Sequence, residues 1–77
     1  MSVIVKDPQI LFGKAHIRGH RIGVYNVAAE VAVGRLFTAE EYAAEFNLSI
    51  EEVNAALEYY ANNRQEIDAE IVRNYGG

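Results

Sequence analysis

The chain has 77 residues, no cysteine and a formal net charge of −4. This length allows one small domain, here taken as residues 1–77, with neither disulfides nor a cysteine-based metal site to strengthen its core. No apolar stretch is long enough to span a bilayer, and the first residues do not resemble a signal peptide, so we expect a cytoplasmic protein. Because the core is small, we also expect a homodimer or larger homo-oligomer.

Charge is divided unevenly along the sequence. Residues 1–35 carry five Lys or Arg side chains against two acidic ones, a net charge of +3. Residues 36–77 carry two basic side chains against nine acidic ones, a net charge of −7. This division indicates that the two ends of the chain contact different partners.

The first 24 residues favour strands. An apolar run at residues 3–5 is stopped by Asp7-Pro8, and a second apolar run, Ile10-Leu11-Phe12, ends at a glycine. We predict two or three short strands, which form a β-hairpin arm over residues 1–24.

A basic, glycine-rich segment from Gly13 to Val24 is the candidate nucleic-acid contact. Its apolar residues, Ile17 and Ile22, are flanked by basic or polar ones, which predicts a half-buried hairpin with a charged outer face. One interpretation is a structural turn with solvated charges; the other is a cationic hairpin that contacts phosphate. The side chains that would make this contact are Lys14, His16, Arg18, His20 and Arg21.

Helical periodicity begins near Tyr25. The spacing of the apolar residues predicts a first helix over residues 25–33, with Gly34 as its left-handed C-terminal cap. A Thr38–Glu41 capping box begins a second helix over residues 39–46, which Asn47 can end in a left-handed conformation.

A second capping box, Ser49 with Glu52, begins a third helix at Ile50. A short helix, a tight turn and a longer helix form a helix-turn-helix, which we assign to residues 25–57. The predicted core comprises Tyr42, Ala43, Phe46, Leu48, Val53, Ala56 and Leu57, with Val27 and Val31. Glu51 and Glu52 in the first turn of the third helix would repel phosphate, and Asn54 is the one obvious base-reading side chain nearby. One interpretation is that the helix-turn-helix is only a scaffold; the other is that it contacts DNA.

The helical pattern continues beyond Leu57, with a weak point at Asn62-Asn63, and predicts a C-terminal helical extension over residues 58–77. Its apolar and aromatic side chains exceed what a three-helix core can absorb and are typical of an interface. The predicted partner-binding residues are Tyr59, Tyr60, Ile67, Ile71 and Tyr75. The alternative is that the helix folds back and buries them.

Motifs of catalysis are absent from the sequence. It has no cysteine nucleophile, no His-x-x-x-His pair within a helix and no glycine-rich phosphate loop. His16 and His20 are four residues apart, but in a strand-turn segment this spacing does not bring them to one face. We therefore expect no enzymatic activity, no metal and no cofactor.

The sequence resembles a small bacterial and archaeal family called domain of unknown function 433. The similarity covers residues 4–60 and rests on several short motifs. They are Asp7-Pro8, Ile10-Leu11, Gly13-Lys14, Ile17-Arg18-Gly19, Arg21-Ile22, Val24, Gly34, Thr38-Ala39-Glu40-Glu41, Leu48-Ser49, Glu51-Glu52-Val53, Ala56-Leu57 and Tyr59.

This resemblance implies a mainly helical fold, with short strands before a homeodomain-like or winged-helix-like helix-turn-helix. It also implies an antitoxin of a toxin–antitoxin module, which binds a PIN-like ribonuclease toxin and operator DNA. Five residues depart from the family pattern, and all lie in or beside the basic segment. Phe12 stands where glycine is common, Ala15 and Gly23 where proline is common, His16 where an aliphatic residue is common and His20 where threonine is common.

Two functional hypotheses follow from these observations. In the first, the chain is an antitoxin-like regulator whose basic head and helix-turn-helix contact DNA and whose aromatic, acidic tail binds a basic ribonuclease. In the second, it is a self-assembling interaction module with no nucleic-acid role, and the tail helices pair to form a dimer.

Overall fold

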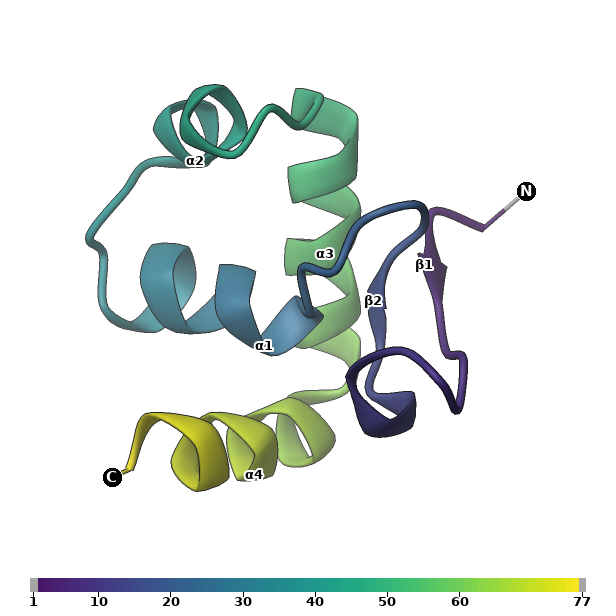
Figure 1. Ribbon diagram of the computed structural model, residues 1–77. Coiled ribbons are helices and arrows are strands. Elements are labelled where there is room, and N and C mark those ends of the chain that lie inside the picture. Colours follow the sequence, from purple (N-terminus) through teal and green to yellow (C-terminus); the bar gives the residue numbers. More distant parts are fainter. Residues whose placement is uncertain (1, 77) are drawn as a thin grey trace.

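Four helices and a two-stranded antiparallel sheet make up the structure, a computed structural model that describes residues 2–76 (Figure 1). The elements are β1 (Ile4–Val5), the turn η1 (Leu11–Gly13), β2 (His16–Ile17), α1 (Val24–Val27), its continuation η2 (Ala28–Val33), α2 (Ala39–Glu45), α3 (Ile50–Asn62) and α4 (Arg64–Tyr75). The predicted mainly helical fold with short N-terminal strands is confirmed. The first and last positions of the predicted domain lie outside the described residues.

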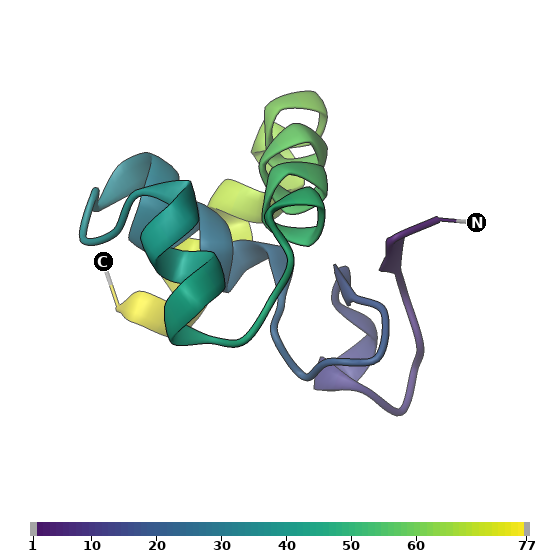
Figure 2. The same cartoon turned by 90° about the horizontal axis from the view of Figure 1, so that it is seen from above.

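Helix α3 is the central element. It contacts α1, α2 and both strands. In Figure 1 the other helices lie on one side of α3 and the strands on the opposite side, and Figure 2 shows the same separation from above. No helix within residues 2–76 is long and apolar enough to cross a membrane.

Strand β2 lies in the middle of the N-terminal segment. It pairs with β1 through Ile4 opposite Ile17, and its other edge bonds to residues 22–24, where the Val24 N–H donates to the Ala15 carbonyl at 2.9 Å. Because both edges are covered and α3 packs on the strand, residues 15–17 are all buried. The apolar run at residues 10–12, where a strand was predicted, leads into the turn η1 instead.

The first predicted helix forms over nearly its expected length, as α1 and η2, but its second half is a wide π-helix. There the Gly34 N–H donates to the Ala29 carbonyl, five residues back, at 2.7 Å. The prediction of a left-handed Gly34 was wrong: its φ is −78°, and Arg35 takes the left-handed conformation with φ 55°. Glycine is needed at position 34 because the backbone approaches the Ala29 carbonyl closely: a Cβ would lie 2.7 Å from its oxygen.

Both predicted capping boxes form. The Thr38 hydroxyl accepts the Glu41 N–H at 3.1 Å, and the Glu41 carboxylate accepts the Thr38 N–H at 2.9 Å. Ser49 and Glu52 make the same pair of bonds at the start of α3. Asn47 is left-handed as predicted, with φ 57°. These local bonds fix the start of both helices and the turn between them.

Six of the nine predicted core residues are buried, Val31 and Leu57 are half-buried, and Phe46 is exposed. Tyr42, Val53 and Val27 are almost completely buried, whereas Phe46 remains 39% exposed and was wrongly assigned to the core. Phe46 follows the last residue of α2, where one ring face packs against Tyr42 at a centroid distance of 4.4 Å. The ring also makes an edge contact with Phe37, at a centroid distance of 6.0 Å.

Helix α4 folds back and packs on α1 instead of extending from the domain. The chain reverses at Asn63, whose φ of −140° and ψ of 45° interrupt the helix at the predicted weak point. Ile67 is fully buried and Tyr60 is 6% exposed. The alternative that the last helix folds back is therefore confirmed, but of the five predicted partner-binding residues only Tyr60 and Ile67 are buried.

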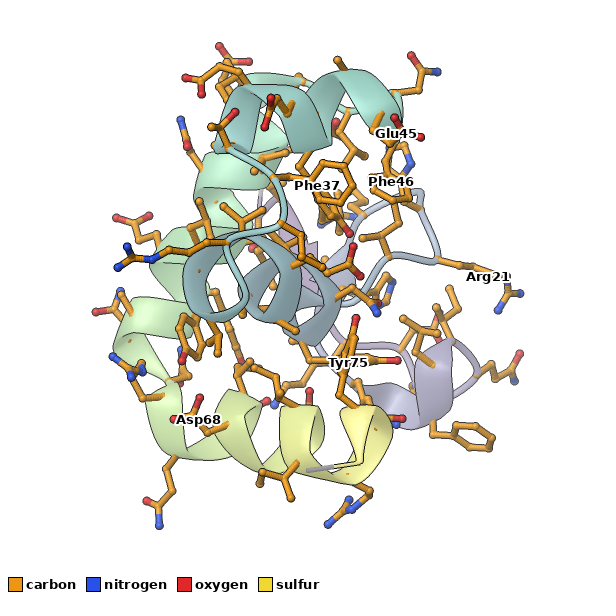
Figure 3. The ribbon with its side chains drawn as sticks, turned by 90° about the vertical axis from the view of Figure 1, so that its left-hand side faces the viewer. Arg21, Phe37, Glu45, Phe46, Asp68 and Tyr75 are labelled. Carbon is orange, nitrogen blue, oxygen red and sulfur yellow. The ribbon has the colours of Figure 1, made fainter. Side chains whose placement is uncertain are left out.

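Polar bonds hold α4 in place at both ends. The Tyr75 hydroxyl donates to the Glu30 carboxylate at 2.8 Å and accepts the Asn26 amide at 3.1 Å. The Tyr60 hydroxyl donates to Asp68 at 2.7 Å, and burial together with this bond raises the pKa of Tyr60. Tyr75 lies between α4 and α1 in Figure 3, which is consistent with these bonds.

The Glu52 capping bond should make the stability of the fold depend on pH. The Ser49 backbone N–H holds the pKa of Glu52 below its usual value, with a smaller contribution from His20. The folded chain therefore binds this proton less tightly than the unfolded chain, and the bond stabilises the fold above the unfolded pKa of about 4.3. We expect this stabilisation to disappear as the pH falls through the lower, folded pKa.

The test compares urea unfolding of the native chain and Glu52→Gln between pH 7 and pH 3. The two free energies of unfolding should differ at pH 7 and converge in acid. Glu58→Gln, on the exposed face of the same helix, is the control and should follow the native curve. A constant difference at every pH would contradict this role for the carboxylate.

Candidate interaction surfaces

A basic turn is the first candidate surface, and we define it as residues 18–21. It connects β2 to the next segment, with Gly19 at φ 82° and the His20 N–H donating to the Ile17 carbonyl at 3.0 Å. Arg18 and Arg21 are both exposed. Figure 3 shows Arg21 extending away from the ribbon. The structure therefore brings three of the five predicted nucleic-acid residues together: Arg18, His20 and Arg21.

Contacts to neighbouring segments fix the orientation of this turn. The Arg18 Nε donates to the Ser2 carbonyl at 2.9 Å, and the Arg18 N–H donates to the Val3 carbonyl at 2.8 Å. His20 Nε2 lies 3.5 Å from a Glu52 carboxylate oxygen on α3. The basic turn is consequently held beside the first turn of α3.

The other two predicted residues lie elsewhere. His16 is 1% exposed, and its Nδ1 lies 3.2 Å from the Lys14 carbonyl oxygen. Its assignment as a nucleic-acid contact was wrong, because the side chain is buried in the fold and cannot reach a ligand. Lys14 lies beyond the opposite end of β2, where its Nζ is 6.0 Å from the centroid of the Tyr25 ring.

The exposed face of α3 is acidic. Glu51, Asn54 and Glu58 are exposed along it, and the helix contains no Lys or Arg. A helix with this surface repels the phosphates that flank a DNA groove. The structure therefore supports the interpretation of α3 as a scaffold.

The predicted partner-binding residues do not form one surface. Tyr60 and Ile67 are buried in the core, so their assignment as interface anchors was wrong. Tyr59 and Ile71 are half-buried, and the Tyr59 hydroxyl donates to Glu66 at 3.1 Å. Tyr75 is 47% exposed but bonded to α1. The small size of the chain explains this outcome, since α4 supplies apolar surface that the core needs.

An apolar groove beside α2 was missed by the sequence analysis. It is lined by Leu36, Phe37, Glu41, Ala44 and Glu45. Leu36 is 72% exposed, although it directly precedes the residue that we expected to flank the capping box. The available signal was the pair Leu36-Phe37, of which a hydrophobic staple requires only one member.

The turn η1 presents an unusual exposed aromatic side chain. Leu11, Phe12 and Gly13 all have positive φ, at 52°, 55° and 82°. Phe12 is 95% exposed, and the Lys14 Nζ lies 5.3 Å from its ring centroid. The backbone thus favours glycine at position 12, which explains why glycine is common there in the family pattern; nothing in the structure explains the Phe12 of this chain.

No metal-binding cluster is found among residues 2–76, where no three His, Cys, Asp or Glu side chains gather closely enough. His16 and His20, the two candidates considered above, have separate surroundings. One is buried in β2, and the other faces Glu52.

Comparisons with known proteins identify the family. A family profile described as "Protein of unknown function (DUF433)" matches residues 4–60. The chain belongs to the DUF433 family. The crystal structure of a DUF433 member protein from Anabaena variabilis ATCC 29413 is 33% identical and has a TM-score of 0.83, covering 94% of this chain and 70% of that one. No curated protein matches the chain. The DUF433 assignment confirms the resemblance, and the description of the family gives no function.

Phe12 offers a direct test of the strained turn. Because glycine adopts positive φ without steric cost, Phe12→Gly should stabilise the fold by about 1 kcal/mol, the typical cost of a left-handed residue with a Cβ. The ring itself loses only its contact with Lys14.

Phe12→Ala is the matched variant, since it removes the ring but keeps the Cβ. Thermal unfolding should show a higher Tm for Phe12→Gly and no gain for Phe12→Ala. If both variants behaved alike, the ring rather than the backbone would determine the stability of this turn.

Proposed function

We propose that this DUF433 protein is a non-enzymatic regulator of the antitoxin type. It binds a PIN-like ribonuclease toxin through its acidic helical surface, and it binds operator DNA through the basic turn. The observation that carries the proposal is the separation of charge on the folded surface. Helices α2 and α3 expose Glu40, Glu45, Glu51 and Glu58 and contain no Lys or Arg, whereas Arg18 and Arg21 lie together on the basic turn.

The helix-turn-helix is part of this proposal. Helices α2 and α3, with the tight turn at residues 46–49, have the lengths and caps of such a motif. Glutamates on the exposed face of α3 disfavour its insertion into a DNA groove, so the basic turn makes the phosphate contacts. In this arrangement the helix-turn-helix supports the turn through His20 and Glu52, which are 3.5 Å apart.

The self-assembling module has less support. That hypothesis required the aromatic and apolar side chains of the last helix to pair between copies. Ile67 and Tyr60 instead contribute to the core of one chain.

The proposal predicts a specific loss of DNA binding. Arg21 is exposed and has no bond to another described residue that its removal would break. Arg21→Ala should weaken DNA binding to all sequences alike and lower the slope of log K against log salt by about 1, as expected for one lost phosphate contact. Arg73→Ala, an exposed arginine on α4, should change neither quantity.

The partner is tested by affinity purification of the tagged chain from its native host, with mass spectrometry and a nuclease-sensitive assay of the eluate. A stoichiometric small basic ribonuclease together with DNA is expected. Recovery of the chain alone, free of nucleic acid, would contradict the proposal.

A further inference from the structure

The groove beside α2 combines apolar and charged walls. Its volume is about 440 Å³, and it is open to solvent. Its apolar walls are Leu36, Phe37 and Ala44, and its charged walls are Glu41 and Glu45. Figure 3 shows Phe37 beside Phe46, with Glu45 close to both.

The backbone before α2 holds the groove open. The Leu36 N–H donates to the Glu30 carbonyl at 2.8 Å, which closes the wide end of η2, and Arg35 is left-handed with φ 55°. This geometry turns Leu36 outward, where it is 72% exposed. In the isolated chain, an exposed leucine contributes little hydrophobic stabilisation, because most of its apolar surface stays in contact with water.

Packed aromatic rings form the base of this region. Phe37 makes edge contacts with Tyr42 and Phe46 at centroid distances of 5.6 Å and 6.0 Å. Tyr42 is buried beneath them. Phe46, which contacts Phe37, is 39% exposed and adds apolar surface beside the groove. The base is therefore rigid, while its outer surface remains available to a partner.

The rim is acidic. Helix α2 has the sequence AEEYAAE, with three glutamates and no basic residue, and no ion pair among residues 2–76 uses any of the three. Arg35 is the basic residue adjacent in sequence. An occupant of this groove must therefore combine apolar side chains with positive charge.

We propose that this groove binds a cationic amphipathic helix of a partner protein. The inference rests on the proposed function, of which it names the protein-binding surface. The walls are side chains of a helix and its preceding turn, which offer no free strand edge, so the occupant must satisfy its own backbone hydrogen bonds. A helix with apolar residues on one face and Lys or Arg beside them meets this requirement.

A second copy of the chain is a poorer occupant. A two-fold pairing of this face would bring Glu41 and Glu45 of one copy against the same residues of the other, and like charges oppose such contact. Within residues 2–76, none of the helices has a basic apolar face that could bind there instead: α2 and α3 have no basic residue, and α4 has only Arg64 and Arg73.

The probe is a synthetic amphipathic helix of Leu and Lys, compared with a Leu/Glu peptide of the same apolar pattern. Titration into isotopically labelled protein should shift the amide resonances of residues 33–46 with the Lys peptide, and the Glu peptide should leave them unchanged. Shifts centred on α3 or α4 would overturn the assignment of the groove.

Matched variants then measure how much the apolar and acidic walls together contribute to peptide affinity. Leu36→Ser combined with Glu45→Lys should reduce affinity for the Lys peptide by at least about tenfold, since it removes an apolar anchor and reverses a charge. The control is Val72→Ser combined with Gln65→Lys and Ala69→Lys, which removes an exposed apolar side chain and changes the net charge by the same amount at exposed positions of α4. It should stay within about twofold of the native affinity. Equal losses in both proteins would mean that general charge attraction, not the groove, binds the peptide.

The same two proteins separate this inference from the proposed function. If the native chain captures a small basic ribonuclease and the groove variant captures it equally well, the groove assignment fails while the regulator survives. If the peptide binds the groove but no such ribonuclease is captured, the proposed function fails while the groove survives. Self-association that is lost in the groove variant, measured by sedimentation, would identify a second copy as the occupant and overturn the proposal.

Discussion

The packing of α4 against α1 is the contact on which the other features of this small protein depend. A 77-residue chain without disulfides has few apolar side chains to bury, and α4 contributes Ile67 to the core completely. Tyr75 then connects the end of α4 to Asn26 and Glu30 through its hydroxyl. Because the last helix is used in this way, the surfaces left for partners lie on other elements, at the basic turn and beside α2.

Local features of the fold were predictable from the sequence. The two capping boxes, the left-handed Asn47 and the break at Asn63 each depend on bonds between residues a few positions apart, so their residue types were sufficient evidence. The mainly helical class followed from the same signals. Family membership was predictable as well, since the short motifs that carry it lie within residues 4–60.

Features that depend on distant contacts were not predictable in the same way. The burial of His16 results from a strand covered on both edges, which its own neighbours in sequence do not indicate. The direction of α4 depends on its packing against α1, which is distant in sequence. At Gly34 the sequence correctly indicated the end of a helix. The π-helix ends there without a positive φ, and glycine is needed because the Ala29 carbonyl oxygen leaves no room for a Cβ. For the candidate sites, Arg18, His20 and Arg21 lie together as predicted. Of the predicted interface residues, Tyr60 and Ile67 are buried in the core instead.

The electrostatics of α3 connect these observations to function. Glu52 caps the helix and also faces His20, so one carboxylate serves both the helix start and the position of the basic turn. A basic residue at that position would suit DNA better but could not accept the Ser49 N–H. The sequence therefore retains an acidic helix beside a cationic turn. This arrangement is why the proposed function gives phosphate binding to the turn, and contact with a basic protein to the acidic surfaces of α2 and α3.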